Sequence, residues 1–451
     1  MQIDKGSFRD PSGSVFYENG EIFRLVNELY FPHYQHLMTS GLYRKLIEKG
    51  LLIPHTEVSQ SPLVLKPERI PFISYPHEWS FSQLKRAALI TLEAQLLAAE
   101  YNMHLKDASA YNVQFRQGKA ILIDTLSFEL KTGSIPWIAY RQFCQHFLGP
   151  LTLQAHVDWR LRNLSLTHID GPPLDLIVKL LPLSRLLRPS LLVHLFFHSK
   201  FQAKTNFKPQ KKSLDLCSQS SIQALILSLK SAVNSIEWDY PKTTWQNYGE
   251  ENSYSSQAFS HKESLIKQYL SVVKPGIVWD LGANEGHFSQ IASQFSKEVV
   301  ALDSDPVCIE RLFNKQTPLL PLLMDLSVPT PAYGWGESER KSLAERGPTD
   351  LLMALALVHH LRVSVGVPFS HIAEYFSKMC RYLIIEFIPS DDKKFIQMTP
   401  ENRIDCGAYT EGYFLKYFCH YFKIIQRDPI VDSTRVLFLM KSIKEPLCSQ
   451  S

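Results

Sequence analysis

Five polar side chains in the second half of this 451-residue chain occupy positions from which they could bind one ligand together. Each stands at or directly after the end of a short apolar run, and apolar runs separated by helix-length segments are typical of a buried parallel sheet. The carboxyl ends of parallel strands meet at one edge of the sheet, where ligands bind. Carboxylates and imidazoles there could hold hydroxyl groups, hold positive charge or move protons. The five residues are Asp280, Asp303, Asp325, His359 and Glu386.

The loop that contains the first of these acids has the composition of a ligand-binding turn. It follows an apolar run and precedes a helical pattern that begins at residue 288. Glycine lets a backbone turn sharply and approach a ligand where a Cβ would clash. The start of the following helix offers free N–H groups. We therefore expect a ligand to contact Asp280, Gly282, Ala283, Asn284 and Gly286.

Three kinds of ligand loop share this order of strand, turn and helix. A dinucleotide-binding loop has a third glycine, and Asp280 would place a negative charge near the pyrophosphate. A P-loop ends in Gly-Lys-Ser/Thr, which is absent here. The order Asp-x-Gly-x-Asn-x-Gly resembles the cofactor loop of class I S-adenosylmethionine (SAM) methyltransferases, and a carboxylate suits the positive groups of SAM. An ordinary strand, turn and helix is the remaining alternative.

This resemblance implies roles for the later polar residues. Asp303 stands 23 residues after Asp280 and would accept hydrogen bonds from both ribose hydroxyls. Asp325 would lie near the adenine amine. His359 and His360 follow the fourth apolar run, where this family places substrate-facing residues, and a histidine there could act as a general base. Alternatively the histidines only shape the pocket, because methyl transfer to an already nucleophilic acceptor needs mainly alignment.

The apolar runs also predict the fold that would position these residues. Five runs with helix-length segments between them indicate a parallel sheet, and two runs near the C-terminus indicate a final antiparallel pair. We expect an α/β domain with a Rossmann-like, seven-stranded methyltransferase sheet. The runs are 277–280, 299–303, 319–324, 351–358, 382–386, 422–425 and 436–439.

The first 200 residues carry a second set of polar residues. Residues 15–24 form two strand-like runs around Asn-Gly, which is a hairpin signal. Asp107, Asn112 and Asp124 then follow with a spacing that resembles the catalytic loop and metal-binding acid of protein kinases and aminoglycoside phosphotransferases. No glycine-rich loop precedes them, and Arg24 is the best candidate for the phosphate-pairing lysine. We expect an α+β, kinase-like domain without phosphotransfer activity; a generic helix, loop and hairpin is the alternative.

Composition narrows the classes of partner. The net charge of +4 is small for this length, so no nucleic-acid partner is expected, and the Asn/Asp-Pro-Pro-Tyr/Phe motif of nucleobase methylation is missing. Seven scattered cysteines without a Cys-x-x-Cys pair predict neither disulfides nor a metal site, and they favour a cytoplasmic location. Residues 176–197 are apolar but interrupted by basic residues and two prolines, which indicates a buried helical pair. Membrane-surface contact is the alternative for that segment, and no transmembrane segment is expected.

Four segments together resemble one family, the bacterial nodulation-protein-type SAM methyltransferases with an N-terminal kinase-like domain. They are residues 105–112 (Leu-Lys-Asp-Ala-Ser-Ala-Tyr-Asn), residues 137–144, the loop 280–284, and residues 354–361 (Ala-Leu-Ala-Leu-Val-His-His-Leu). The resemblance implies SAM as cofactor and methyl transfer to an unidentified acceptor, with small molecules and saccharides as candidate classes. A bifunctional phosphotransferase–methyltransferase and a pseudo-enzyme that binds partners through its N-terminal half are the alternatives.

The same reading divides the chain. We expect a kinase-like domain at residues 1–200, a basic and helical linker at 201–261, a methyltransferase domain at 262–443 and a tail at 444–451. The oligomeric state is left open by the sequence.

Overall fold

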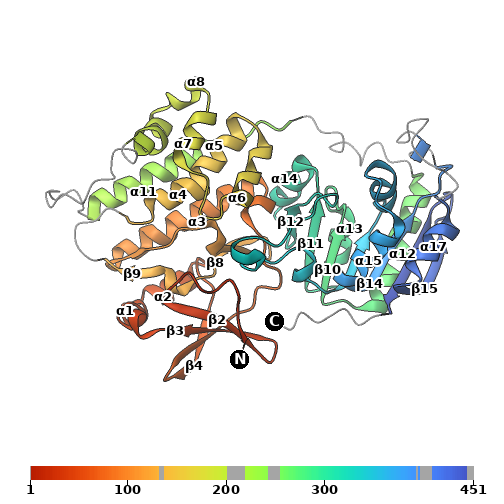
Figure 1. Cartoon of the computed structure of the whole chain (residues 1–451), viewed down its shortest axis with the longest axis horizontal. Coiled ribbons are helices and arrows are strands. Elements are labelled where there is room, and N and C mark those ends of the chain that lie inside the picture. The colour runs from red at the N-terminus through yellow and green to blue at the C-terminus, as the bar shows by residue number, and fades with distance from the viewer. Residues whose placement is uncertain are drawn as a thin grey trace. The chain divides into compact units, whose positions relative to one another are not determined.

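The computed structural model describes residues 2–131, 137–200, 219–241, 254–392, 395–396 and 409–443. The chain divides into two compact units, Met1–Tyr240 and Pro241–Ser451, whose elements are labelled in Figure 1. Among the described residues, no helix is long and apolar enough to cross a membrane.

Unit 1 begins with a five-stranded antiparallel sheet in the order β1-β2-β3-β5-β4. The predicted hairpin is confirmed: Glu18 pairs with Glu21, and Asn19 and Gly20 form the turn with φ of 53° and 78°. Positive φ at both turn residues matches the right-handed twist of the two strands. The strands are β1 (Gln2–Ile3), β2 (Gly13–Glu18), β3 (Glu21–Val26), β4 (His55–Gln60) and β5 (Leu63–Pro67).

A long central helix organises the rest of unit 1. Helix α3 (Phe81–Glu100) begins with a capping box, in which the Ser80 side chain accepts from the Gln83 N–H and the Gln83 side chain accepts from the Ser80 N–H. It packs against α11 (Gln219–Asn234). Two small antiparallel pairs follow α3, β6 (Met103–Leu105) with β9 (Phe128–Leu130) and β7 (Val113–Arg116) with β8 (Lys119–Leu122). The other α-helices are α1 (Phe31–Thr39), α2 (Leu42–Glu48), α4 (Tyr140–Phe143), α5 (Gly149–His156), α6 (Leu164–Thr167), α7 (Leu174–Leu180), α8 (Leu183–Leu186) and α9 (Pro189–Leu191).

Unit 2 is built on one seven-stranded sheet in the order β12-β11-β10-β13-β14-β16-β15. The first five strands in this order run parallel, and β16 pairs antiparallel with both β14 and β15. The predicted α/β class is therefore confirmed. The strands are β10 (Ile277–Leu281), β11 (Glu298–Asp303), β12 (Leu320–Leu323), β13 (Thr349–Ala354), β14 (Cys380–Phe387), β15 (Phe422–Pro429) and β16 (Val436–Ser442).

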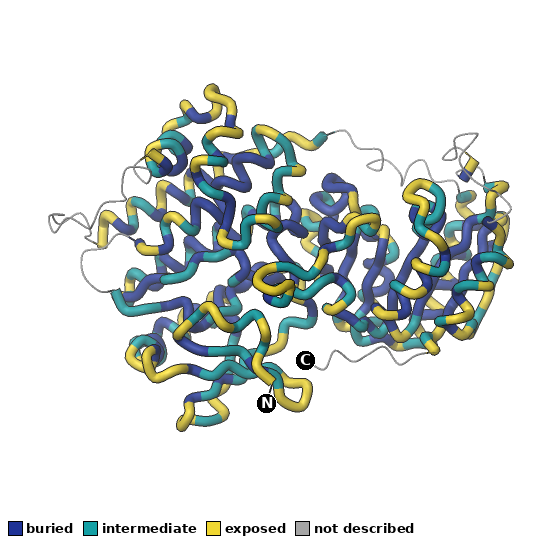
Figure 2. The backbone as a smooth tube through the Cα atoms, viewed as in Figure 1, coloured by how far each residue is buried: buried dark blue, intermediate teal, exposed yellow. Residues whose placement is uncertain are grey.

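The five parallel strands of unit 2 are largely buried because helices cover the sheet, as the dark tube in Figure 2 shows, whereas the edge strand β15 is partly exposed. Val278, Val299 and Leu351 are each at most 2% exposed and belong to one continuous core. The covering helices are α12 (Ser256–Val273), α13 (His287–Ala292), α14 (Pro306–Asn314), α15 (Phe369–Met379) and α17 (Glu411–Phe418). A chain cut at residue 262, the predicted start of this domain, would divide α12.

One strand is shorter than its apolar run. The run at 351–358 predicted a strand to residue 358, but β13 ends at Ala354. Ala356 has a φ of 49°, a left-handed conformation in which a strand cannot continue. Residues 355–357 of this run instead line a cavity at the carboxyl edge of the sheet. Two parts of the predicted linker, residues 201–218 and 242–253, lie outside the described residues.

Candidate functional site

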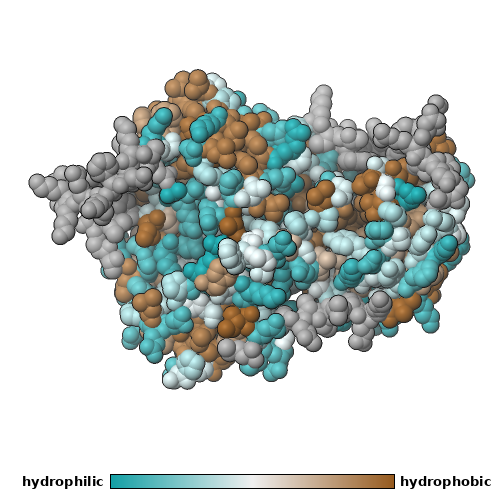
Figure 3. Space-filling view, viewed as in Figure 1, coloured by the Kyte–Doolittle hydropathy of each residue, from teal (hydrophilic) through white to brown (hydrophobic). Residues whose placement is uncertain are grey.

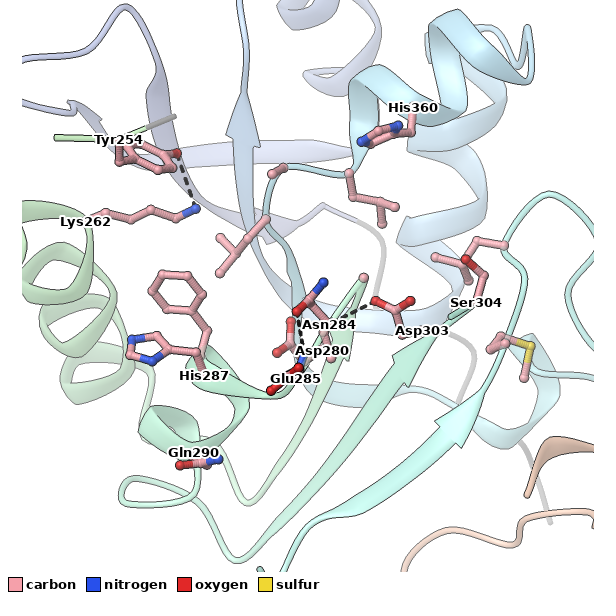
Figure 4. A pocket seen from close by; sticks show the side chains of 18 of the residues that line it. Tyr254, Lys262, Asp280, Asn284, Glu285, His287, Gln290, Asp303, Ser304 and His360 are labelled. Atoms are coloured by element: carbon pink, nitrogen blue, oxygen red, sulfur yellow. Dashed lines mark hydrogen bonds between the residues drawn. The ribbon is translucent and has the colours of Figure 1, made fainter. Parts of the chain in front are cut away.

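A cavity of about 1120 Å³ opens at the carboxyl edge of the parallel strands, and all its lining residues belong to unit 2 (Figure 4). The five strand-end positions that the sequence predicted to meet do lie at this edge, although not all of them line the cavity. Seven of the nine predicted site residues are in its wall. They are Asp280, Gly282, Ala283, Asn284, Asp303, Asp325 and His360.

The glycine loop forms one wall of this cavity. Gly282 and Asn284 have φ of 76° and 50°, so the loop turns through left-handed conformations directly after β10. Gly286, which is not in the wall, caps the start of α13 with a φ of 79°. A Cβ at Gly286 would lie 2.5 Å from Cδ1 of Leu312 on α14. A side chain at this position would therefore disturb the packing of α13 against α14. Gly286 acts on the loop through this packing and not through contact with the cavity.

Asp303 at the end of β11 is oriented by backbone groups. Its Oδ2 accepts from the Asn284 N–H at 2.7 Å and its Oδ1 from the Asp305 N–H at 2.8 Å. Burial raises the pKa of Asp303 to about 6, although these N–H groups act to lower it. The carboxylate is thus ionised at neutral pH and fixed in the wall beside Asn284 (Figure 4). A carboxylate oxygen has further lone pairs that can accept from a ligand hydroxyl.

The other two acids differ in exposure. Asp280 is 2% exposed and accepts from the Ser289 hydroxyl at 2.6 Å, so α13 holds it in place. Burial raises its pKa to about 6, and Lys262 acts in the opposite direction. Asp325 follows β12, is exposed, and accepts from both the N–H and the hydroxyl of Ser327. The cavity therefore has a buried acid in its floor and an exposed one at its mouth.

The two neighbouring histidines have different environments. Their ring centroids are 4.1 Å apart, but only His360 lines the cavity. His359 is 2% exposed, and its Nδ1 has no hydrogen-bond partner within the described part of the chain. Burial lowers the pKa of His360 to about 4 and that of His359 well below its usual range. Both rings are neutral at pH 7 and are weak proton acceptors, since an efficient general base has a pKa near the working pH.

Sequence reasoning named Glu386 as a strand-end residue but missed the buried network around it. This network, here called the Glu386 network, adjoins the cavity and consists of Tyr254, Lys262, Glu386 and Arg435. Lys262 Nζ donates to Glu386 Oε2 at 2.7 Å and to the Tyr254 hydroxyl at 3.3 Å, and that hydroxyl donates to Glu386 Oε1. The Arg435 guanidinium lies 4.4 Å from the Tyr254 ring centroid and ion-pairs with Asp392. The side chains of Lys262, Glu386 and Arg435 are at most 3% exposed. Tyr254 and Lys262 also line the cavity (Figure 4).

The Glu386 network reaches the cavity a second time through the backbone. The Ala356 N–H donates to Glu386 Oε2 at 2.8 Å. Because Ala356 is in a left-handed conformation, which costs a non-glycine residue energy, this bond holds a strained segment of the cavity wall in place. Burial raises the pKa of Glu386 to about 7, while Arg435 and the Ala356 N–H act to lower it.

One sequence signal for this network existed. Lys262 falls four residues after Ala258 and four before Ile266, both of which are fully buried on α12. Residues at this spacing share one face of a helix. A lysine within an apolar stripe indicates a buried cation, and a buried cation requires an acid. The sequence could thus have predicted the lysine's burial, but not its partner.

The polar residues predicted in unit 1 form ion pairs and hydrogen bonds with side chains and backbone groups of the same unit. Asp124 ion-pairs with Arg24 at 2.9 Å, and Arg24 also contacts Asp10 at 3.2 Å. Asn112 donates to the Ser127 hydroxyl, which in turn donates to Asp124. Asp107 accepts from the Ser109 N–H and from the Gln142 side chain. In the described ranges, no group of three or more His, Cys, Asp or Glu residues could hold a metal ion. The kinase-like assignment stays a prediction.

Comparisons with known proteins give one relative along nearly the whole chain. No protein-family model matches. The chain is similar to the nodulation protein NoeA of Rhizobium meliloti (strain 1021), with 29% identity over 455 residues that cover 96% of this chain and 94% of NoeA.

Several solved structures are similar to parts of the chain. N-methyltransferase NodS from Bradyrhizobium japonicum WM9, in complex with S-adenosyl-L-homocysteine, is 10% identical, with a TM-score of 0.33 over 45% of this chain and 100% of NodS. Magnesium protoporphyrin IX methyltransferase (ChlM) from Synechocystis PCC 6803 with bound SAM is 14% identical, with a TM-score of 0.28 over 45% of this chain and 87% of ChlM. WbdD is 14% identical, with a TM-score of 0.29 over 47% of this chain and 46% of WbdD. What this chain binds must be inferred from its own cavity.

Proposed function

We propose that unit 2 binds SAM in this cavity and transfers its methyl group to an acceptor that enters from outside. The observation that carries the proposal is the arrangement of Asp303 beside the loop Gly282–Asn284. A fixed carboxylate with free lone pairs suits a pair of ribose hydroxyls, and a loop in left-handed conformations lets backbone approach the ligand. The sheet also has the five parallel strands and the final antiparallel pair that the resemblance to class I methyltransferases implies.

The other wall residues fit the remaining parts of SAM. Asp325 at the mouth suits the adenine amine, and Asp280 in the floor suits the positive charge of the amino-acid end. SAM held by these residues would supply a methyl group on a positively charged sulfur and would leave as the neutral thioether, and an acceptor that carries a proton would release that proton to water. We assign no base to this step, because His360 is a weak proton acceptor at neutral pH. Alignment of acceptor and methyl group then supplies most of the acceleration.

Calorimetry with S-adenosylhomocysteine on the full-length protein tests this proposal. We expect binding, and we expect Asp303→Ala to weaken it by about 1.5–3 kcal/mol, the usual value for hydrogen bonds to a charged group. Glu374→Ala, an exposed acid on α15, is the matched control and should bind as the wild type does. Absence of binding to correctly folded protein would contradict the proposal. Unchanged affinity in Asp303→Ala would remove Asp303 from the site.

A further inference from the structure

A cluster of exposed apolar side chains lies on the helical part of unit 1. It is here called the leucine patch and consists of Leu180, Leu183, Leu187, Val193 and Phe197, which are 37%, 79%, 71%, 52% and 45% exposed. Figure 3 shows a hydrophobic area over α8, which contains the first of the two most exposed leucines. Single exposed apolar residues are common, but five within 18 residues form a patch of the kind that marks an interaction site.

The same helices are also apolar on their inner side. Leu186, Leu191 and Leu195 are at most 4% exposed and pack into unit 1. A helix on a water-facing surface normally has one apolar and one polar face. Here the outward face is apolar as well, so the predicted buried helical pair is found to be buried on one side only. The outward face needs a second apolar environment.

The charged residues within the segment that carries the leucine patch are all basic. Residues 176–200 contain the basic residues Lys179, Arg185, Arg188 and Lys200 and no acidic residue. Lys179, Arg185 and Lys200 are exposed. Asp175, just before this segment, forms an exposed ion pair with Lys179, and such pairs contribute little in water. The patch therefore combines exposed leucines with positive charge.

We propose that the leucine patch docks unit 1 onto the surface of a membrane that contains anionic phospholipids. Apolar side chains that enter the boundary between headgroups and acyl chains, with basic residues against the anionic headgroups, are the features of an interfacial membrane contact. The helices are short, α8 covering Leu183–Leu186 and the following π-helix Leu192–Phe197, which suits shallow insertion. Long basic side chains can lay their stems on apolar surface and keep their charge at the headgroups. This inference does not depend on methyl transfer by unit 2.

Sedimentation of the full-length protein with vesicles tests the proposal. We expect binding to vesicles of phosphatidylglycerol and phosphatidylcholine, and at least about tenfold weaker binding to pure phosphatidylcholine. The double variant Leu183→Ser/Leu187→Ser should weaken binding to the mixed vesicles about tenfold or more, since it removes the two most exposed leucines. Arg185→Glu should weaken binding to the mixed vesicles and leave the weak binding to phosphatidylcholine unchanged.

The matched control is Leu29→Ser, an isolated leucine of unit 1 that is 70% exposed and should bind as the wild type does. Melting temperatures show whether the variants are folded; if the double variant is unstable, each single serine variant and Arg185→Glu give the same comparison. Absence of binding to mixed vesicles, equal binding to both lipids, or equal loss in Leu29→Ser would overturn the proposal. Light scattering that shows a dimer, dissociated by the double variant, would assign the patch to a second copy of this chain instead.

Discussion

Acids gather at two places in this protein, the cavity of unit 2 and the cluster around Arg24 in unit 1, and their partners differ. In the cavity, Asp303 is held by backbone N–H groups, so its charge is not cancelled. In the cluster, Asp124 is held by the Arg24 guanidinium, and Asp10 is held by both Arg24 and Lys106. An acid held by backbone dipoles keeps capacity for a ligand, whereas an acid held by a cation of its own chain is largely satisfied.

The Glu386 network stands between these cases, because it is a fully paired charge cluster that also adjoins the cavity. Its ions are at most 3% exposed, far less than the side chains of the Arg24 cluster, which are 12–32% exposed. Removing one partner of a buried ion pair is costly since the other charge remains in a low-dielectric environment. The three sites should therefore respond to mutation with different magnitudes.

The largest effect is expected for Lys262→Met. Methionine keeps much of the side-chain volume but leaves Glu386 without its closest cation, so the free energy of unfolding should fall by about 3–5 kcal/mol. Urea unfolding of full-length protein, followed by hydrogen exchange of peptides from unit 2, measures it, since fluorescence from the seven tryptophans of the chain would mix the two units. The control is Lys267→Met on the same helix, where the exposed pair with Glu263 at 4.0 Å should contribute less than about 0.5 kcal/mol. Equal effects of the two substitutions would show that the network does not stabilise unit 2.

A smaller effect, with opposite signs for stability and binding, is expected from the pKa of Asp303. Burial raises this pKa to about 6, so the charged form opposes folding at neutral pH, and the opposition is relieved as the pH falls through 6. Asp303→Asn should therefore be more stable than wild type by about 1–3 kcal/mol at pH 8, and the difference should shrink towards pH 5. The buried histidines, whose pKa values are lowered, act in both proteins and cancel in the comparison.

Binding of S-adenosylhomocysteine should change in the other direction. In wild type, affinity should fall as the pH drops below about 6, because protonation removes the acceptor for the ribose hydroxyls. In Asp303→Asn, affinity should be low, and its fall below pH 6 should be smaller than in wild type, because only Asp280, whose pKa is also raised to about 6, then titrates in the cavity. Calorimetry at pH 5, 6, 7 and 8 covers the range from about one unit below the pKa of Asp303 to about two units above it, and it distinguishes the wild type from Asp303→Asn. A pH dependence of the same size in both proteins would mean that another group titrates on binding.

The fold of unit 2 could largely be predicted, because its parallel strands are continuous apolar runs that need no partner to be recognised. The loop was predictable for a similar reason: Gly282 and Gly286 are close in sequence, and a strand–turn–helix is a local structure. The end of β13 was not, since Ala356 adopts its left-handed conformation with support from Glu386, which comes from the next strand in the sheet. The sequence around Ala356 contains no sign of this hydrogen bond to a residue of another strand.

The contacts that the sequence did not predict have a common physical cause. Lys262 and Glu386 are 124 residues apart, so their pairing exists only once the sheet and α12 have packed. His359 and His360 show a related limit, because they are adjacent at the start of the π-helix His360–Ser364 and the sequence alone cannot tell which one lines the cavity. In unit 1, the sequence shows the spacing of Asp107, Asn112 and Asp124, but it does not show that Asp124 pairs with Arg24, which lies 100 residues away along the chain.

The smallest effect is expected for Asp124→Asn in unit 1. The wild type should not hydrolyse ATP in the presence of magnesium, because Asp124 is engaged by Arg24 and Ser127, while Asp107 is engaged by Gln142. Asparagine removes the charge, but Arg24 keeps Asp10 as a partner at 3.2 Å, so the free energy of unfolding should fall by only about 1 kcal/mol. Phosphate release and thermal shifts with magnesium and ATP, compared between wild type and variant, measure both points. Magnesium-dependent turnover that disappears in Asp124→Asn would show that the Arg24 cluster opens to bind a nucleotide. The acids of both units would then be able to bind a ligand, and the ion pairs of unit 1 would only occupy its acids while the nucleotide is absent.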